Sequence, residues 1–280
     1  MKNLFKSSLA ILVGLSLTMS ACKKEDSTTD ENSNNNNNNN NNPLVIPQVQ
    51  KATVFYFGGT WCPPCGAYGK PAKEQLKAQV KSKCSILSCQ VFNSDPMICA
   101  AGDELVGMFA PSGVPAMYIG ANDDVITAMI GGSTATGSTA IGHVNTQSAK
   151  KAKVSVVLSH TTTTDGLINV TINGKFFEDL TSEYFISGYL LEDKLNYTQS
   201  NDLSTEKNVH YNVMRAKYGT SVTGELIKAA PKKDETFKKE MAFFIQPTFK
   251  KENLSIVVVI WKKGTDGKLT ISNSENFHLN

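Results

Sequence analysis

The stretch FGGTWCPPCG, residues 57–66, places two prolines between two cysteines. Such a pair can be a redox-active dithiol, half of a zinc site or an inert structural disulfide. Residues 51–57 lead into it with β-branched and aromatic side chains, which predict a short buried strand. The cysteines therefore follow directly on a strand.

The residues after the cysteines have the period of a helix. Apolar side chains recur at intervals of four from Tyr68 to Val80, so Cys62 lies where this helix begins. Gly69 and Pro71 interrupt the pattern and predict a kinked or broken first half.

Strands and helices alternate over residues 49–150. The predicted order is strand, helix, strand, helix, strand, strand, helix, which indicates an α/β domain around a mixed sheet. After the first strand and helix, the elements are expected at 85–92, 103–109, 112–119, 124–129 and 138–151.

The hydrophobic period changes to two after about residue 151. Seven strand candidates with turn residues between them, and no helical run, predict an all-β, immunoglobulin-like sandwich domain over residues 151–280. The candidates are 154–158, 168–172, 184–191, 209–215, 236–248, 254–262 and 268–277.

The first 21 residues have the layout of a secretory signal peptide, with Lys2 and Lys6 before an apolar run that is too short to span a bilayer. The sequence from Met19 to Cys22 resembles a bacterial lipobox, which implies that Cys22 becomes the lipid anchor. A plain cleavable signal that ends beside a cysteine is the alternative.

Residues 22–48 are polar and asparagine-rich, and they predict a disordered, lipid-anchored tether. We therefore expect a lipoprotein of the cell envelope, held at the outer membrane on its periplasmic or cell-surface face. The formal net charge of +3 gives no electrostatic reason to expect nucleic acid.

The position of the cysteines suggests redox chemistry. A cysteine at a helix N-terminus gains thiolate character, so Cys62 is the candidate nucleophile and Cys65 the resolving thiol. A zinc site would need a second ligand pair, and no other cysteine belongs to a C-x-x-C pair. An inert disulfide has the same geometry and stays open.

These residues resemble the thioredoxin superfamily across roughly residues 49–150. The resemblance rests on the Thr60–Cys65 segment at a helix start and on Gly113-Val114-Pro115 before a strand. It implies that the Val114–Pro115 peptide is cis and faces the dithiol, and that Trp61, Val114 and Pro115 bind an extended protein substrate, with no cofactor or metal.

Two positions depart from the family's pattern, and one of them is the helix proline, Pro71, which comes one residue later than usual. Thioredoxins carry a buried acid in the strand before the motif, and Tyr56 occupies the matching position. A tyrosine cannot act as a carboxylate proton acceptor, so proton removal from Cys65 needs water or another group.

The second half contains another resemblance. The run His210-Tyr-Asn-Val-Met-Arg-Ala216, followed by Gly219 and Gly224, resembles a signature of lipoproteins related to outer membrane protein 28. Those proteins join a thioredoxin-like part to a C-terminal β domain. Asn212 replaces a histidine of that signature, and Arg215 is either solvated or paired at the surface, or part of a binding site.

Three cysteines remain beside the anchor and the motif. Cys84 and Cys89 lie on opposite faces of one predicted strand and cannot bridge each other. Either of them could pair with Cys99, or all three could be plain core or surface residues.

Two functions follow from these patterns. The first is a membrane-tethered thiol–disulfide oxidoreductase that exchanges with protein thiols or disulfides through Cys62 and Cys65. The second is a surface-exposed binding lipoprotein whose thioredoxin-like part is redox-inert and whose β-sandwich meets a surface ligand. The direction of electron flow depends on thiolate stabilisation and does not follow from the sequence.

Overall fold

The structure is a computed structural model that describes residues 44–92, 94–133 and 135–279. The predicted signal peptide, Cys22 and the tether up to residue 43 lie outside the described residues. From Leu44 onward the chain forms one compact unit. Gln48, the last residue of the predicted tether, donates from Nε2 to the carbonyl oxygen of Ala152 at 2.7 Å. Within the described ranges, no helix has the length and apolar character needed to cross a membrane.

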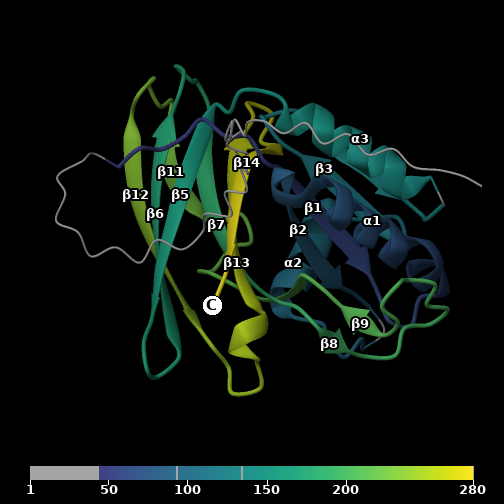
Figure 1. Ribbon diagram of the computed structural model, residues 1–280. Coiled ribbons are helices and arrows are strands. Elements are labelled where there is room, and N and C mark those ends of the chain that lie inside the picture. Colours follow the sequence, from purple (N-terminus) through teal and green to yellow (C-terminus); the bar gives the residue numbers. More distant parts are fainter. Residues whose placement is uncertain (1–43, 93, 134, 280) are drawn as a thin grey trace, which may run out of the picture. The chain divides into compact units, whose positions relative to one another are not determined.

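The first half has the predicted order of elements (Figure 1). It forms a mixed sheet flanked by helices, because β1 pairs in parallel with β2 and antiparallel with β3, and β3 pairs antiparallel with β4. The bounds are β1 Ala52–Gly58, a π-helical turn Cys65–Gly69, α1 Lys70–Val80, β2 Cys84–Gln90, α2 Ala100–Phe109, β3 Ala116–Gly120, β4 Thr127–Ile130 and α3 Thr136–Ser148.

The second half is almost entirely β. Its strands are β5 Val154–Thr162, β6 Leu167–Phe176, β7 Glu183–Glu192, β8 Leu195–Asn196, β9 Val209–His210, β10 Val213–Lys217, β11 Glu225–Ala229, β12 Thr236–Phe244, β13 Leu254–Lys263 and β14 Leu269–His278. The predicted strand at 209–215 is two strands, because Asn212 between them has a left-handed φ of 58°. The short strands β8 and β11 were not predicted.

The sandwich is not self-contained, which corrects the immunoglobulin-like prediction. Its larger sheet continues into the first half in the order β14-β13-β7-β10-β2-β1-β3-β4, with β11 also paired to β7. The junction is a parallel pairing of β10 with β2, at Val213 and Ser88. Alternating hydrophobicity reports which faces of a strand are buried and carries no information on which strand lies beside it, so the sequence could not reveal this continuity.

Strands β7 and β13 form a layer that is buried on both faces. One face packs on the separate three-stranded sheet β12-β6-β5, with Ile256 and Val258 among its core residues. The other face packs on the first half, with Val257, Val259 and Trp261. In Figure 1, β7 and β13 lie between β5 and β6 on one side and β1 and β2 on the other.

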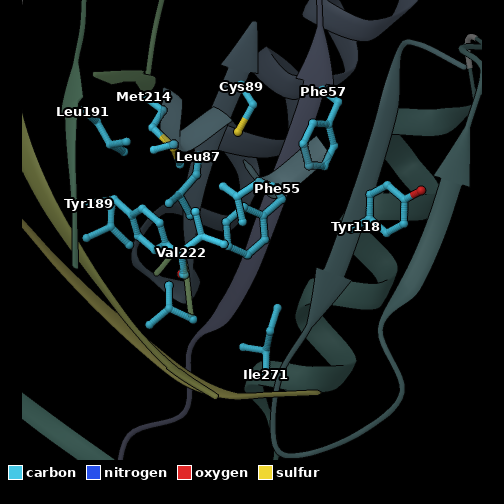
Figure 2. Close-up of a cluster of buried hydrophobic side chains, with 14 of the residues drawn as sticks. Phe55, Phe57, Leu87, Cys89, Tyr118, Tyr189, Leu191, Met214, Val222 and Ile271 are labelled. Carbon is cyan, nitrogen blue, oxygen red and sulfur yellow. The ribbon is translucent and has the colours of Figure 1, made fainter. Parts of the chain in front are cut away.

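The shared core unites residues far apart in the chain. Figure 2 shows Phe55 and Leu87 from β1 and β2 facing Tyr189 and Leu191 from β7. The Phe55 ring also stacks on Trp261 with centroids 5.6 Å apart. The helices α1 and α3 cover the opposite face of β1, over a separate core.

A buried asparagine links the start of the described chain to β14, the strand that pairs with β13. Asn273 on β14 is 2 % exposed. Its Nδ2 donates to the carbonyl oxygens of Val49 and Val154, each at 2.8 Å, and its Oδ1 accepts from the Lys51 amide at 2.8 Å. One side chain therefore satisfies backbone groups of two separate segments, residues 49–51 and β5.

We predict that Asn273→Ala lowers the free energy of unfolding by about 3 kcal/mol, because it leaves buried backbone groups without partners. Urea unfolding measures the change. Asn169→Ala, at an exposed position of β6, is the matched control and should change stability by less than about 0.5 kcal/mol. Equal effects of the two substitutions would contradict the role assigned to Asn273.

Candidate active site

The two cysteines of the CPPC motif are joined in a disulfide. Cys62 and Cys65 have Cα atoms 5.2 Å apart. Both are almost fully covered, at 2 % and 1 % exposed. Because the sulfurs are bonded to each other, they offer no thiolates to a zinc ion. Within the described residues, no group of three metal-ligating side chains lies together.

The helix begins irregularly, as Gly69 and Pro71 predicted. Pro63 and Pro64 lie ahead of the π-helical turn Cys65–Gly69, and α1 starts only at Lys70, with Pro71 in its first turn. Pro63 and Pro64 remove no helical hydrogen bond, since their N–H groups would have had no partner at the start of the turn. Pro71 follows a turn that is already helical, where a proline does remove one. The Cys65 amide points at Cys62 Sγ, at 3.1 Å.

The Val114–Pro115 peptide lies against the dithiol. It is cis, as the thioredoxin resemblance implied. The carbonyl oxygen of Val114 is 3.8 Å from Cys62 Sγ. The structure thus brings Cys62, Cys65, Val114 and Pro115 together although the chain separates the two pairs by about fifty residues.

Trp61 lies beside the dithiol and is partly exposed. Its indole N–H donates to the carbonyl oxygens of Val91 at 3.0 Å and Phe92 at 3.2 Å. Trp61 and Phe92 remain 38 % and 44 % exposed. These two exposed side chains are called the apolar rim below: Trp61 directly precedes Cys62, and Phe92 is joined to Trp61 through its carbonyl oxygen.

Tyr56 occupies the buried space behind the disulfide. It is 3 % exposed, and burial raises the pKa of its hydroxyl above the usual value. A Cβ atom added at Gly69 would lie 2.6 Å from the Tyr56 hydroxyl oxygen and 2.6 Å from Pro115 Cβ. Only glycine fits where the helix crosses both groups, at a position four residues after Cys65.

A loop from the second half covers the CPPC motif. This loop, residues 197–208 between β8 and β9, is called the strap below. Gln199 Nε2 donates to the carbonyl oxygens of Gly59, Thr60 and Cys62 at 3.0 to 3.2 Å. The Ser200 amide donates to Thr60 at 2.7 Å, and the Leu203 amide donates to Gly66 at 3.1 Å.

An ion pair holds the strap to α1. Lys70 Nζ lies 2.8 Å from Asp202 Oδ2, and both side chains are at most 5 % exposed. Burial alone would raise the pKa of the Asp202 carboxyl, but hydrogen bonds from Lys70, Ser204 and the Asn208 amide outweigh it and lower the pKa to about 2. Asp202 is therefore ionised at neutral pH.

A buried aspartate fixes the residue before Trp61. Asp95 Oδ2 accepts from the Thr60 amide at 2.6 Å and from the Thr60 hydroxyl at 2.8 Å. Asp95 is 5 % exposed. Asp95 and Gln199 thus hold the segment before Cys62 from two sides.

The residues that resemble the outer membrane protein 28 signature have structural contacts. His210 is buried, and its Nε2 lies 2.9 Å from the carbonyl oxygen of Tyr197. The carbonyl oxygen of Asn212 accepts from the Ser88 amide at 2.8 Å. Arg215 pairs with Glu192 at 3.3 Å, in keeping with the paired alternative of the prediction.

The remaining cysteines are free thiols in this structure. Cys84 and Cys89 belong to different cores on opposite faces of β2, as predicted. Burial raises the pKa of Cys84 to about 12 and raises that of Cys89 as well. Cys99, at the start of α2, is half-buried.

Comparison with known proteins identifies a similar fold. No protein-family model and no curated protein matches the chain. Among solved structures, HBP35 of Porphyromonas gingivalis is similar over 84 % of this chain and 77 % of its own, with a TM-score of 0.66 and 14 % identity. This likeness shows a shared fold across both halves of the chain.

Two other solved structures align over shorter parts. A domain of the outer membrane lipoprotein Omp28 from Porphyromonas gingivalis is 22 % identical, with a TM-score of 0.33 over 46 % of this chain and 89 % of its own. A thiol-disulfide isomerase from Corynebacterium glutamicum is 12 % identical, with a TM-score of 0.28 over 37 % of this chain and 84 % of its own.

Sequence reasoning missed the groups that enclose the site. Gln199 and Asp202 lie more than a hundred residues beyond the cysteines, in a polar stretch with no motif. Lys73, a buried lysine that donates to the Ser88 hydroxyl and to the Tyr211 carbonyl oxygen, lies in the predicted helix beside Ala72, on a face that the helical period predicts to be buried.

We predict that Gly66→Ala loosens the strap. A Cβ atom at residue 66 would lie 2.1 Å from the Ser200 carbonyl oxygen, so the strap must move. Hydrogen exchange of residues 197–208 should become faster, and stability should fall by about 1–3 kcal/mol.

The control for this prediction is Gly142→Ala. A Cβ there, on α3, meets no atom within 4 Å, so the helix should gain up to about 1 kcal/mol. Unchanged exchange in Gly66→Ala would refute the close contact.

We also predict an acid-side loss of stability that depends on His210. Burial and the charges of Lys73 and Lys70 lower the pKa of His210 to about 4. The unfolded histidine binds its proton near pH 6.5, so stability falls as pH drops from about 6.5 to 4, by up to about 3 kcal/mol.

Unfolding at pH 7.5 and 5 measures this loss. His210→Gln can still donate to Tyr197 and should lose less stability between the two values, whereas the control His143→Gln should follow the wild type. Parallel curves for wild type and His210→Gln would contradict the assignment.

Proposed function

We propose that this chain is a thiol–disulfide oxidoreductase of the cell envelope, tethered through a lipid on Cys22. Cys62 is the nucleophile and Cys65 the resolving thiol in exchange with protein thiols or disulfides. The observation that carries the proposal is the Cys62–Cys65 disulfide at a helix start, with the Val114 carbonyl oxygen 3.8 Å from Cys62 Sγ. No cofactor is required, since the exchange is between sulfurs.

The exchange has two steps. In the oxidising direction, a substrate thiolate attacks Cys62, the Cys62–Cys65 bond breaks, and Cys65 leaves and takes up a proton. A second substrate thiolate then attacks the substrate sulfur of the mixed disulfide, which releases the oxidised substrate and the Cys62 thiolate. The reducing direction runs through the same mixed disulfide, which Cys65 then resolves.

The surroundings of Cys62 suit an extended peptide. Trp61 and Phe92 offer exposed apolar surface, and the Val114 main chain lies beside the sulfur. Main-chain pairing of a substrate strand with Val114 would hold a disulfide or thiol near Cys62. The strap blocks approach from the side of α1, so the apolar rim is the direction of entry that we propose.

We predict that Cys65→Ser traps mixed disulfides. Without the resolving thiol, a substrate joined to Cys62 cannot be released by attack from within the protein. Envelope extract mixed with the variant should give adducts that dithiothreitol removes, visible on non-reducing gels.

Two controls accompany the trap. Cys62→Ser/Cys65→Ser should give no adducts, and Cys65→Ser/Cys99→Ser should give as many as Cys65→Ser, because Cys99 is outside the site. Absence of adducts that depend on Cys62 would overturn the proposed activity.

The second candidate function is a surface-exposed binding lipoprotein with a redox-inert disulfide. The near-complete burial of both cysteines and the hydrogen-bonded strap favour it. It requires that Cys62→Ser/Cys65→Ser protein keep the cellular phenotype of the wild type. Loss of that phenotype, with the variant folded, would exclude a pure scaffold.

A further inference from the structure

Two free cysteines lie on either side of one glycine of α2. A Cβ atom added at Gly102 would lie 3.7 Å from Cys89 Cβ and 3.8 Å from Cys99 Sγ. Apart from the chain neighbours of Gly102, these are the side chains nearest to that point among the described residues. Because glycine has no side chain, no group at this position separates the two cysteines, where β2 ends and α2 begins.

The structure distinguishes Cys89 from Cys84 as the neighbour of Cys99. Cys89 belongs to the core shared by the two halves, and Cys99 packs against the same core. Cys84 lies in the separate core on the opposite face of β2. Burial, and next the charge of Cys99, raise the pKa of the Cys89 thiol, so the two sulfurs are close enough to interact. Of the two pairings that the sequence left open, only that of Cys89 with Cys99 joins residues of one core.

Cys99 is the member of the pair that an oxidant can reach. Its side chain is half-buried, whereas Cys89 is 1 % exposed. Burial raises the pKa of the Cys99 thiol, and the amides of Gly102 and Ala101, which donate to its sulfur, oppose that shift. A reagent from solution therefore meets Cys99 first, and Cys89 follows from within the protein.

The segment between the two cysteines holds the residues that precede the CPPC motif. Asp95 accepts hydrogen bonds from the amide and the hydroxyl of Thr60. The carbonyl oxygens of Val91 and Phe92 accept from the indole N–H of Trp61. A bond between residues 89 and 99 would close this segment into a loop, which removes conformational freedom from the chain within it.

We infer that Cys89 and Cys99 form a second disulfide, which fixes the segment between them and, through it, the start of the CPPC motif. The bond is a modification of this chain and takes no part in the exchange at Cys62. The inference therefore goes beyond the proposed function and does not depend on that activity. It requires a disulfide oxidant of low molecular weight, of the glutathione type.

The bond forms by two successive thiol–disulfide exchanges. The Cys99 thiol loses its proton and attacks one sulfur of the oxidant, whose disulfide breaks and releases a first thiolate. The Cys89 thiol then loses its proton and attacks Cys99 Sγ, so that the Cys89–Cys99 bond forms and the second thiolate leaves. The two released thiolates take up the two protons. Two cysteine thiols are thus oxidised while one disulfide is reduced to two thiols.

The experiment uses full-length Cys62→Ser/Cys65→Ser protein in detergent, so that the CPPC motif takes no part. The reduced protein is equilibrated with glutathione buffers of increasing oxidised fraction, and free thiols are then alkylated. Trypsin cuts after residue 83, and endoproteinase Asp-N cuts before residues 95 and 103. Mass spectrometry then shows whether peptide 84–94 is joined to peptide 95–102. The same series is run with Cys99→Ser, Cys89→Ala or Cys84→Ala added.

We expect the two peptides to be joined in most of the protein in the oxidising buffers. Cys99→Ser and Cys89→Ala should give no joined peptides. The matched control Cys84→Ala removes a buried thiol from the other face of β2 and should give as many as its parent. Hydrogen exchange of residues 94–98 should be about tenfold slower in the oxidised protein than in the reduced protein, a difference that Cys99→Ser should lack.

Each other outcome contradicts a stated part of the inference. Free thiols throughout the series, or a Cys99 that carries only glutathione, would overturn the disulfide. Joined peptides that Cys84→Ala abolishes would assign the bond to the wrong face of β2. Joined peptides without slower exchange would overturn the role of the bond in fixing the segment. Should Cys89→Ala fail to fold, Cys99→Ser decides, because serine is a favourable residue at a helix start.

Discussion

The burial of β13 on both faces is the constraint on which the rest of the structure depends. One face of this strand needs the three-stranded sheet, and the other needs β1, β2 and α2. Neither half can bury its own apolar surface without this shared layer, because an exposed row of Val257, Val259 and Trp261 would remain. The hydrophobic effect therefore makes the second half a structural part of the first.

This dependence extends to the chemistry. The chain leaves the shared layer at the end of β7 and returns through β10, which pairs with β2. The strap lies between these two strands, so its anchors at the sheet determine where Gln199 and Asp202 meet the CPPC motif. The groups around the dithiol thus come from both halves, as the buried Lys70–Asp202 pair illustrates.

The sequence predicted local features well and long-range contacts poorly. The strand before the cysteines, the broken helix start at Gly69 and the cis Pro115 follow from local rules and one family resemblance. The continuous sheet does not, although the unbroken apolar run of residues 256–261 was a signal, since such a run is typical of a strand buried on both faces. The strap's contacts depend on tertiary packing and leave no local pattern.

The origin of the strap also affects how the molecule matures. A nascent chain presents Cys62 and Cys65 well before residues 197–208 have been made. The contacts between Asn273 and the segment around Val49 span more than two hundred residues. The sheet to which the strap is anchored therefore assembles late. Until then the cysteines are open to any oxidant or thiol in their surroundings. The first disulfide exchange of each molecule can thus take place during its own biogenesis.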